Sequence, residues 1–214
     1  NCLFNNNYVD NSTDGHGGAI EWYAEKGLVD NSIFTNNHAY DGGAIYVGKG
    51  SGNCVINNSY FRGNNVTNDT AGHGGAIEWY AGNGTVLNST FINNHAYDGG
   101  AIYVGDQSEK INITESTFRA NTAVTKGGAI SIEASAVTIN ASNFYDNNAT
   151  EGGAMYVGGQ DNIDYVYSSV FEGNKAKDGV GGAIYWEASS SFIYDTNLTS
   201  NAADYGGALY LGGN

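Results

Sequence analysis

Two short signatures alternate along the whole chain and restrict its fold more than any other feature. Gly-Gly-Ala begins at Gly17, Gly42, Gly74, Gly99, Gly127, Gly152, Gly181 and Gly206. Phe-x-x-Asn falls between these sites and begins at Phe4, Phe34, Phe61, Phe91, Phe118, Phe144 and Phe171, with Leu198 in the eighth place. Recurrence of one pattern at a period of about 20 to 50 residues indicates a solenoid or another repeat array.

The spacing of the two signatures shows where the repeat accepts insertions. From Gly-Gly-Ala to the next Phe position the distance alternates between 17 and 19 residues. From Phe to the next Gly-Gly-Ala it is 8 residues in every second repeat, but 13, 13, 9 and 10 in the others. Fixed strands with one variable corner are typical of a solenoid. The unit is a pair of rungs, and residues 4–60 and 61–117 agree at 36 of 57 positions.

Aligned repeats predict three strands per rung. After Gly-Gly-Ala, apolar residues such as Ile45 and Val47 flank an outward Glu or Tyr, which is the period of a half-buried strand. A β-branched residue five positions before each Phe predicts a second strand, and the third ends on the Phe. A small residue precedes the Phe by two positions. The odd step between the β-branched and small positions predicts a bend.

The Asn of Phe-x-x-Asn is expected to lie in a turn, and its amide to bond to the equivalent amide of the next rung. The Ala or Val two residues later is expected to fill that corner. We therefore predict an all-β fold: a right-handed single-stranded parallel β-helix of about eight rungs, with three short strands per rung. Residues 1–214 form one segment of four modules (roughly 4–60, 61–117, 118–170 and 171–214). Because the pattern starts and stops midway, we expect a fragment of a longer repeat protein.

Charge and composition exclude several classes of partner. The net charge is −14 with only 8 Lys and Arg, so binding to nucleic acid is not expected. No apolar run is long enough to span a membrane, so no membrane insertion is expected in this segment. Cys2 and Cys54 fall about two rungs apart, beyond disulfide reach, and we expect two buried free thiols.

The alternation of Gly-Gly-Ala-Ile with Phe-x-x-Asn resembles the repeats of chlamydial polymorphic outer-membrane proteins. It also resembles the adhesin-like proteins of methanogenic archaea, to which the phrase NGTVLNSTFINNHAYDGGAIYVG is closer. This resemblance covers residues 4–214. It implies the β-helical shaft of an extracellular protein at the cell surface or cell wall, without catalytic residues. Its partners would be cell-surface glycans or proteins, or like subunits stacked end to end in a filament or wall layer.

The outer face of the first strand is the candidate binding surface, because tyrosines offer flat amphipathic contact area. Its residues are Glu21, Tyr23, Tyr46, Glu78, Tyr80, Tyr103, Tyr156, Tyr185, Glu187 and Tyr210. The alternative is cross-strand packing on an exposed sheet. A polysaccharide hydrolase or lyase is a further alternative. Glu21 and Glu78 lie two rungs apart, about 10 Å, which is marginal for paired catalytic carboxylates.

No cofactor is predicted, and the histidines do not predict a metal site. His16 and His73, like His38 and His95, are copies 57 residues apart, and copies two rungs apart cannot share one ion. Structural calcium near Asp14, Asp41 and Asp98 stays open. Glycosylation sequons predict a secreted chain. The candidates are Asn11, Asn57, Asn65, Asn68, Asn83, Asn112, Asn140 and Asn148, while Asn88 and Asn197 are more constrained by the Phe position.

Overall fold

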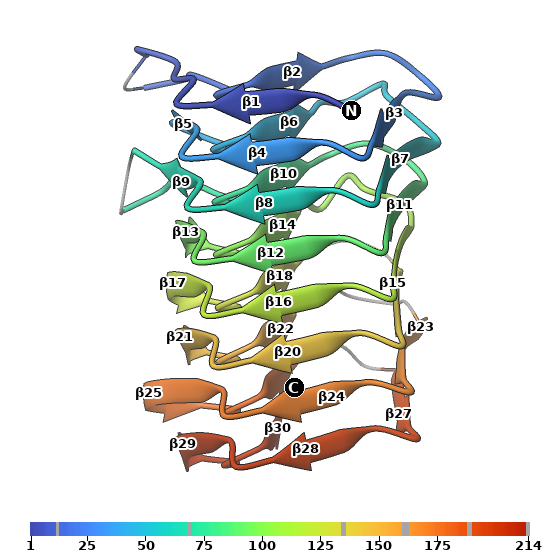
Figure 1. The fold of residues 1–214 in the computed structure, drawn as a ribbon. Helices are drawn as coiled ribbons and strands as arrows, with labels where there is room; N and C mark the ends of the chain where they lie inside the picture. Colours follow the sequence, from blue (N-terminus) through green and yellow to red (C-terminus); the bar gives the residue numbers. More distant parts are fainter. Residues whose placement is uncertain (12, 68–69, 134–135, 160–162, 188–189, 213–214) are drawn as a thin grey trace.

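The strands of each repeat stack on their counterparts in the next repeat and form four parallel sheets (Figure 1). The computed structural model describes residues 1–214 except 12, 68–69, 134–135, 160–162, 188–189 and 213–214. Within the described residues, every regular secondary-structure element is a β-strand. They wind into a right-handed solenoid of about seven turns. The predicted all-β parallel solenoid is therefore confirmed, with eight strands in two sheets and seven in the other two.

The first sheet, the Phe sheet, holds the Phe-x-x-Asn motif and lies in front in Figure 1. Its strands are β1 (Leu3–Asn5), β4 (Ile33–Thr35), β8 (Tyr60–Arg62), β12 (Thr90–Ile92), β16 (Thr117–Arg119), β20 (Asn143–Tyr145), β24 (Val170–Glu172) and β28 (Asn197–Thr199). The phenylalanine rings stack from rung to rung with centroids 4.4 to 4.9 Å apart and planes within 7°. This spacing matches the separation of neighbouring strands, so each rung adds one ring to the core.

The sheet behind it in Figure 1, the Tyr sheet, follows Gly-Gly-Ala. It contains β2 (Ile20–Trp22), β6 (Ile45–Val47), β10 (Ile77–Trp79), β14 (Ile102–Val104), β18 (Ile130–Ile132), β22 (Met155–Val157), β26 (Ile184–Trp186) and β30 (Leu209–Leu211). The first and last residues of each strand point inward, and from β6 to β26 they are all buried. The middle residue faces outward, as the alternation predicted.

The third sheet, the Ile sheet, contains the β-branched positions. Its strands are β3 (Leu28–Asp30), β7 (Cys54–Asn57), β11 (Gly84–Leu87), β15 (Ile111–Thr114), β19 (Val137–Asn140), β23 (Ile163–Tyr167) and β27 (Ser190–Tyr194). The predicted bend follows it: Asn31, Asn58, Asn88, Glu115, Ala141, Ser168 and Asp195 all have positive φ angles of 44° to 52°. This left-handed residue reverses the inward parity before the serine position.

A fourth sheet, the Ala sheet, corrects the expected three strands per rung. Its members are β5 (His38–Ala39), β9 (Asn65–Val66), β13 (His95–Asp98), β17 (Thr122–Lys126), β21 (Asn148–Glu151), β25 (Lys175–Val180) and β29 (Ala202–Tyr205). The buried Ala or Val was expected only to fill a corner. Its neighbours extend far enough on both sides to pair with the next rung, as Ala149 does with Ala176. The segment is therefore a short strand.

The asparagines form a continuous ladder between the Phe and Ala sheets, which confirms the predicted amide bonding. Each Asn side-chain amide donates to Oδ1 of the next Asn at 2.9 to 3.0 Å, from Asn7 to Asn201. The same amide donates to the carbonyl of a Phe in the preceding rung, as Asn94 does to Phe61. The left-handed residue of this corner is the one before the ladder, such as Asn93, and not the ladder Asn itself.

The glycine pair forms the corner between the Ala and Tyr sheets. Gly74, the first glycine of one pair, has a φ of 61°, a conformation that favours glycine. At the second glycine, a Cβ on Gly75 would stand 2.2 Å from the carbonyl oxygen of Gly100 in the next rung. The first glycine is therefore favoured by its backbone conformation, and the second is required by the close approach of the next rung.

The cysteines are unbonded, as predicted, but only Cys54 is buried. Cys2 is exposed because it precedes β1, which pairs with β4 on one side. The prediction of two buried thiols is thus wrong for Cys2. Among the described residues there is no helix with the length and apolar character that crossing a membrane would need.

Candidate functional site

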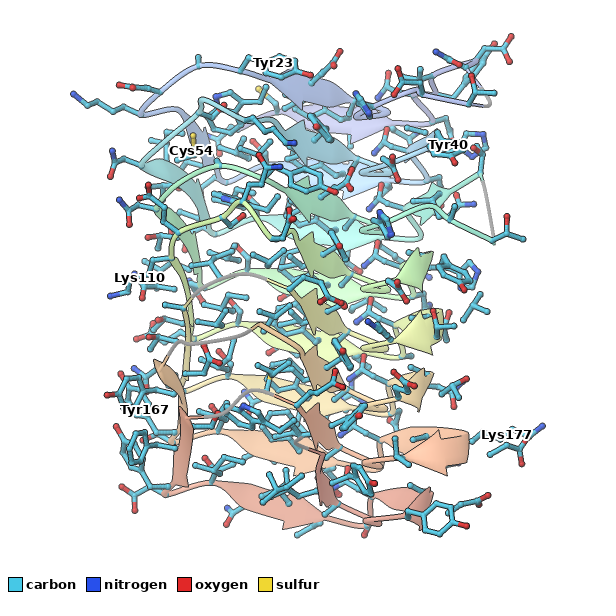
Figure 2. The ribbon with its side chains drawn as sticks, turned by 180° about the vertical axis from the view of Figure 1, so that it is seen from behind. Tyr23, Tyr40, Cys54, Lys110, Tyr167 and Lys177 are labelled. Carbon is cyan, nitrogen blue, oxygen red and sulfur yellow. The ribbon has the colours of Figure 1, made fainter. Side chains whose placement is uncertain are left out.

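The predicted contact residues lie on the outer face of the Tyr sheet, which Figure 2 shows from outside. Strand pairing places the middle residues in one column, in the order Glu21, Tyr46, Glu78, Tyr103, Ser131, Tyr156, Tyr185 and Tyr210. Tyr23 and Tyr80 lie beside this column over Gly48 and Gly105, where an added Cβ would come within 2.2 Å of the tyrosine ring. Glycine in every second rung therefore lets these rings lie against the sheet.

The tyrosine rings form two separate runs on this face. Tyr23, Tyr46, Tyr80 and Tyr103 follow one another with centroids 6.0 to 6.2 Å apart. Tyr156, Tyr185 and Tyr210 form the second run with a spacing of 5.3 Å. Ser131 separates the two runs.

The predicted contact residues differ greatly in how much surface they offer. Glu21, Tyr23 and Glu187 are exposed, and Tyr80, Tyr103, Tyr185 and Tyr210 are half-buried. Tyr46, Tyr156 and Glu78 are buried, so they offer almost no contact area to a ligand. Burial raises the pKa of Tyr46 and Tyr156 above the ordinary value, with carboxylates such as Glu78 and Glu187 acting in the same direction.

A column of charged residues borders this face and was missed by the sequence reasoning. The residue immediately before each glycine pair is His16, Asp41, His73, Asp98, Lys126 and Glu151 in the first six rungs. Strand pairing or isolated bridges align all neighbours in this column except Asp41 and His73, which are joined by a hydrogen bond from the His73 backbone N–H to the Asp41 carboxylate. The signal was present in the sequence, because a charged or titratable residue recurs at one fixed position beside the glycines.

The column brings Asp41, His73 and Glu78 together although they come from two different rungs. Nδ1 of His73 lies 3.4 Å from Oε1 of Glu78 and 3.9 Å from Oδ1 of Asp41. The backbone N–H of His73 donates to the same Asp41 oxygen at 2.8 Å. One ligand atom from each of the three side chains lies within 4.8 Å of the other two.

Burial and charge both act on the protonation of this cluster. Burial raises the pKa of Glu78 to about 7, although the hydrogen bond with His73 opposes this change. Burial also raises the pKa of Asp41, against the His73 N–H and the His73 charge. For His73, burial lowers the pKa, but the hydrogen bond with Glu78 and the neighbouring carboxylates outweigh it and the pKa is raised.

A basic group lies over the tyrosine of the following rung at three equivalent positions. The His16 ring stacks on Tyr46 with centroids 4.2 Å apart, and the His73 ring stacks on Tyr103 at 4.3 Å. In the third module Lys126 takes this place, with Nζ 4.2 Å from the centroid of Tyr156 and 2.9 Å from Oε1 of Glu133. The column thus holds a built-in cation in the module after His73.

A polar groove of about 350 Å³ opens where the Tyr sheet turns into the Ile sheet. Its side chains include Lys49, Asn53, Tyr80, Asn83, Gln107 and Glu109. The Lys49 ammonium lies 5.5 Å from the centroid of the Tyr80 ring. The groove therefore combines an aromatic surface with hydrogen-bonding groups of both charges.

The sequon asparagines are distributed over several faces. Asn11 and Asn83 are exposed, while Asn57, Asn65, Asn112, Asn140 and Asn148 are half-buried; Asn68 lies outside the described residues. Asn88, at the corner beside the Phe sheet, and Asn197, the first residue of β28, were expected to be constrained but are exposed. Asn88 has a positive φ and its amide donates to Oδ1 of Asn58 at 2.6 Å.

The comparisons with known proteins agree with this architecture. The model of the right-handed β-helix region family matches residues 1–166. The chain belongs to the right-handed β-helix family. In this β-helix, residues 168–185 also match the repeat of the Chlamydia polymorphic membrane protein family.

One curated protein is similar to this β-helix over most of the described length. It is the metabotropic glutamate receptor-like protein R of Dictyostelium discoideum, with 29% identity over 171 residues. The match covers 79% of this chain but only 10% of that protein. No solved structure matches the β-helix significantly.

Proposed function

We propose that this β-helix is a segment of an extracellular, adhesin-like surface protein and that it acts as a non-catalytic rod that binds carbohydrate. The observation that carries the proposal is the groove beside Tyr80. Agreement with the repeat of a surface membrane protein family supports the cellular location. The acidic chain, with a net charge of −14, favours a neutral or basic ligand over an anionic one.

The chemistry of the groove suits a sugar ring. A carbohydrate has an apolar face that packs on an aromatic ring and hydroxyl groups that exchange hydrogen bonds with amides and carboxylates. Tyr80 supplies the ring, and Asn53, Gln107 and Glu109 supply polar groups at its rim. The Lys49 ammonium, which lies over this ring, would move aside for the sugar and supply a further donor.

A hydrolytic role for the same face has no support from the carboxylate pair suggested by the sequence. Glu78 is 1% exposed beneath the surrounding rings, so its carboxylate is not accessible to a polysaccharide. Glu21 is exposed in the first rung and has no exposed carboxylate partner at the Glu78 position. We therefore propose binding and not cleavage.

A glycan array probed with the purified chain tests this proposal. Tyr80→Ala and Glu109→Gln should each reduce binding of any positive glycan by tenfold or more, whereas Tyr165→Ala, on the Ile sheet, should not. Asn83 is itself a sequon residue, so Thr85→Val serves as a second control that removes the sequon and keeps the Asn83 amide. Absence of binding at high density, or equal loss in Tyr165→Ala, would reject the groove.

A further inference from the structure

The strongest unassigned feature is the cluster of Asp41, His73 and Glu78, and it does not depend on the proposed binding function. All three offer atoms that coordinate metals, and these atoms converge from two consecutive rungs. Asp41 precedes the glycine pair of one rung, His73 precedes that of the next, and Glu78 lies in β10. The duplicated histidines still do not share an ion in this arrangement, because the partners of His73 are carboxylates.

An independent observation points to a missing ligand. Oε2 of Glu78 is buried and has no partner at hydrogen-bonding geometry within the described chain, while Oε1 faces His73 and the Tyr80 hydroxyl acts on the same carboxylate. A carboxylate oxygen that is removed from water without a partner is costly, and such groups are normally paired or coordinate a metal. A cation bound by both oxygens of Glu78 would satisfy Oε2 as well as Oε1.

The orientation of His73 is that of a metal ligand. Its Nδ1 faces the two carboxylates, and its Nε2 lies 3.9 Å from Oδ2 of Asp98 on the other side. Histidines bound to metals commonly direct their second nitrogen to a carboxylate, which orients the ring. Stacking on Tyr103 further restrains the ring.

In the next module a positively charged side chain, Lys126, holds the position of His73. There Asp98 and Lys126 occupy the places of Asp41 and His73, and Ser131 occupies the place of Glu78. The Lys126 ammonium donates to Glu133 and lies over Tyr156. The third module, which has serine in place of Glu78, thus places a lysine ammonium where His73 lies in the second module.

We propose that Asp41, His73 and Glu78 bind a divalent transition-metal ion, with Zn²⁺ the best match, and that this ion joins two successive rungs. One imidazole and two carboxylates suit Zn²⁺ better than Ca²⁺, which prefers oxygen ligands alone. Tetrahedral bonds of about 2.0 to 2.2 Å place ligand atoms roughly 3.3 to 3.6 Å apart. The separation of 3.4 Å between His73 and Glu78 lies in this range, that of 3.9 Å between His73 and Asp41 is slightly longer, and all three ligand atoms lie within 4.8 Å of one another. His73 and Asp41 are partly accessible, which leaves a path for the ion.

Titration of the purified, chelator-treated chain with Zn²⁺ tests the proposal. We expect one ion per chain and a Tm that rises by about 5 °C or more at saturating Zn²⁺. His73→Gln and Glu78→Gln should each weaken binding at least tenfold. Because Glu78→Gln removes a buried charge, its metal-free Tm should not fall, which separates loss of the site from failure to fold.

His16→Gln is the matched control, because both histidines lie in the same sequence, Gly-His-Gly-Gly-Ala-Ile-Glu-Trp-Tyr-Ala. The partners of His16 are Glu21 and Asp14, and no Asp from a preceding rung faces it in the described chain. The His16→Gln variant should bind Zn²⁺ like the unmodified chain. Equal loss of binding in His16→Gln and His73→Gln, or no Zn²⁺ binding at micromolar concentration, would overturn the site and leave His73 as an imidazolium between carboxylates.

Discussion

The side-chain amide of Asn64 donates to Oδ1 of Asn94 at 3.0 Å, and the backbone N–H of Asn64 donates to the same oxygen at 3.0 Å. Asn94 in turn donates to Asn121 and to the carbonyl of Phe61. One buried side chain thus completes the hydrogen bonds of two neighbouring rungs.

Asn94→Ala should destabilise the solenoid by about 2 to 4 kcal/mol, because it leaves the buried backbone N–H of Asn64 without its acceptor and removes the bonds from the Asn64 amide to Asn94 and from the Asn94 amide to Asn121 and Phe61. Asn7→Ala is the control. Asn7 is exposed and contributes only donors to Asn37, so the loss should be about 1 kcal/mol or less. Urea unfolding followed by circular dichroism measures both, and similar midpoints for the two variants would contradict the importance of the ladder.

Substitution of the second glycine in a corner should depend on whether a further rung lies against it. Gly75→Ala places a Cβ 2.2 Å from the carbonyl of Gly100 and should cost more than about 2 kcal/mol or prevent folding. At Gly207 the nearest atom to the added Cβ is 3.7 Å away, so Gly207→Ala should stay within about 0.5 kcal/mol. Thermal unfolding of both variants compares them directly, and a large loss in Gly207→Ala would show that conformation and not contact sets the requirement.

The phenylalanine column should dominate the apolar contribution to stability. Phe91 is fully buried between Phe61 and Phe118, with centroids 4.7 and 4.8 Å away. Phe91→Ala should therefore lower the free energy of unfolding by about 3 to 5 kcal/mol. Phe192→Ala removes the same side chain from the exposed face of the Ile sheet and should cost under about 1 kcal/mol. If Phe91→Ala and Phe192→Ala lowered the free energy of unfolding equally in denaturant titrations, the buried ring stack would contribute no more than an exposed phenylalanine.

Stability should fall as the pH rises through the titration range of Asp164. Burial raises the pKa of Asp164 to about 6, although the Val137 N–H donates to its Oδ1 at 2.8 Å and opposes the change. The folded state holds this proton more tightly than the unfolded state does. The contribution of this protonated carboxyl to stability is therefore complete below about pH 4 and is lost as the pH passes 6. The resulting decrease in the free energy of unfolding is at most about 3 kcal/mol.

Asp164→Asn should remove that part of the pH dependence and raise Tm at pH 8 relative to the unmodified chain. Asp204→Asn, at an exposed position, is the control and should leave the Tm profile between pH 4 and pH 8 unchanged. A profile that is the same in Asp164→Asn and the unmodified chain would place the titrating group elsewhere.

Much of the fold followed from the sequence because each solenoid position is repeated and its environment is the same in every rung. The Phe, Asn and β-branched positions of the alignment became the ring stack, the amide ladder and the buried Ile-sheet column. The fourth strand did not follow, because β5 (His38–Ala39) is too short for alternation to be visible and forms only by pairing with the next rung.

The sequence by itself determined the period, the parallel stacking and the inward residues, since these depend on local spacing and on side-chain type. It did not determine which outward residues meet. Asp41 and Glu78 are 37 residues apart in the chain, and only the register of neighbouring rungs brings both beside His73. The burial of Glu78 was likewise decided by the tertiary structure, because rings from adjacent rungs cover a position that alternation alone places at the surface.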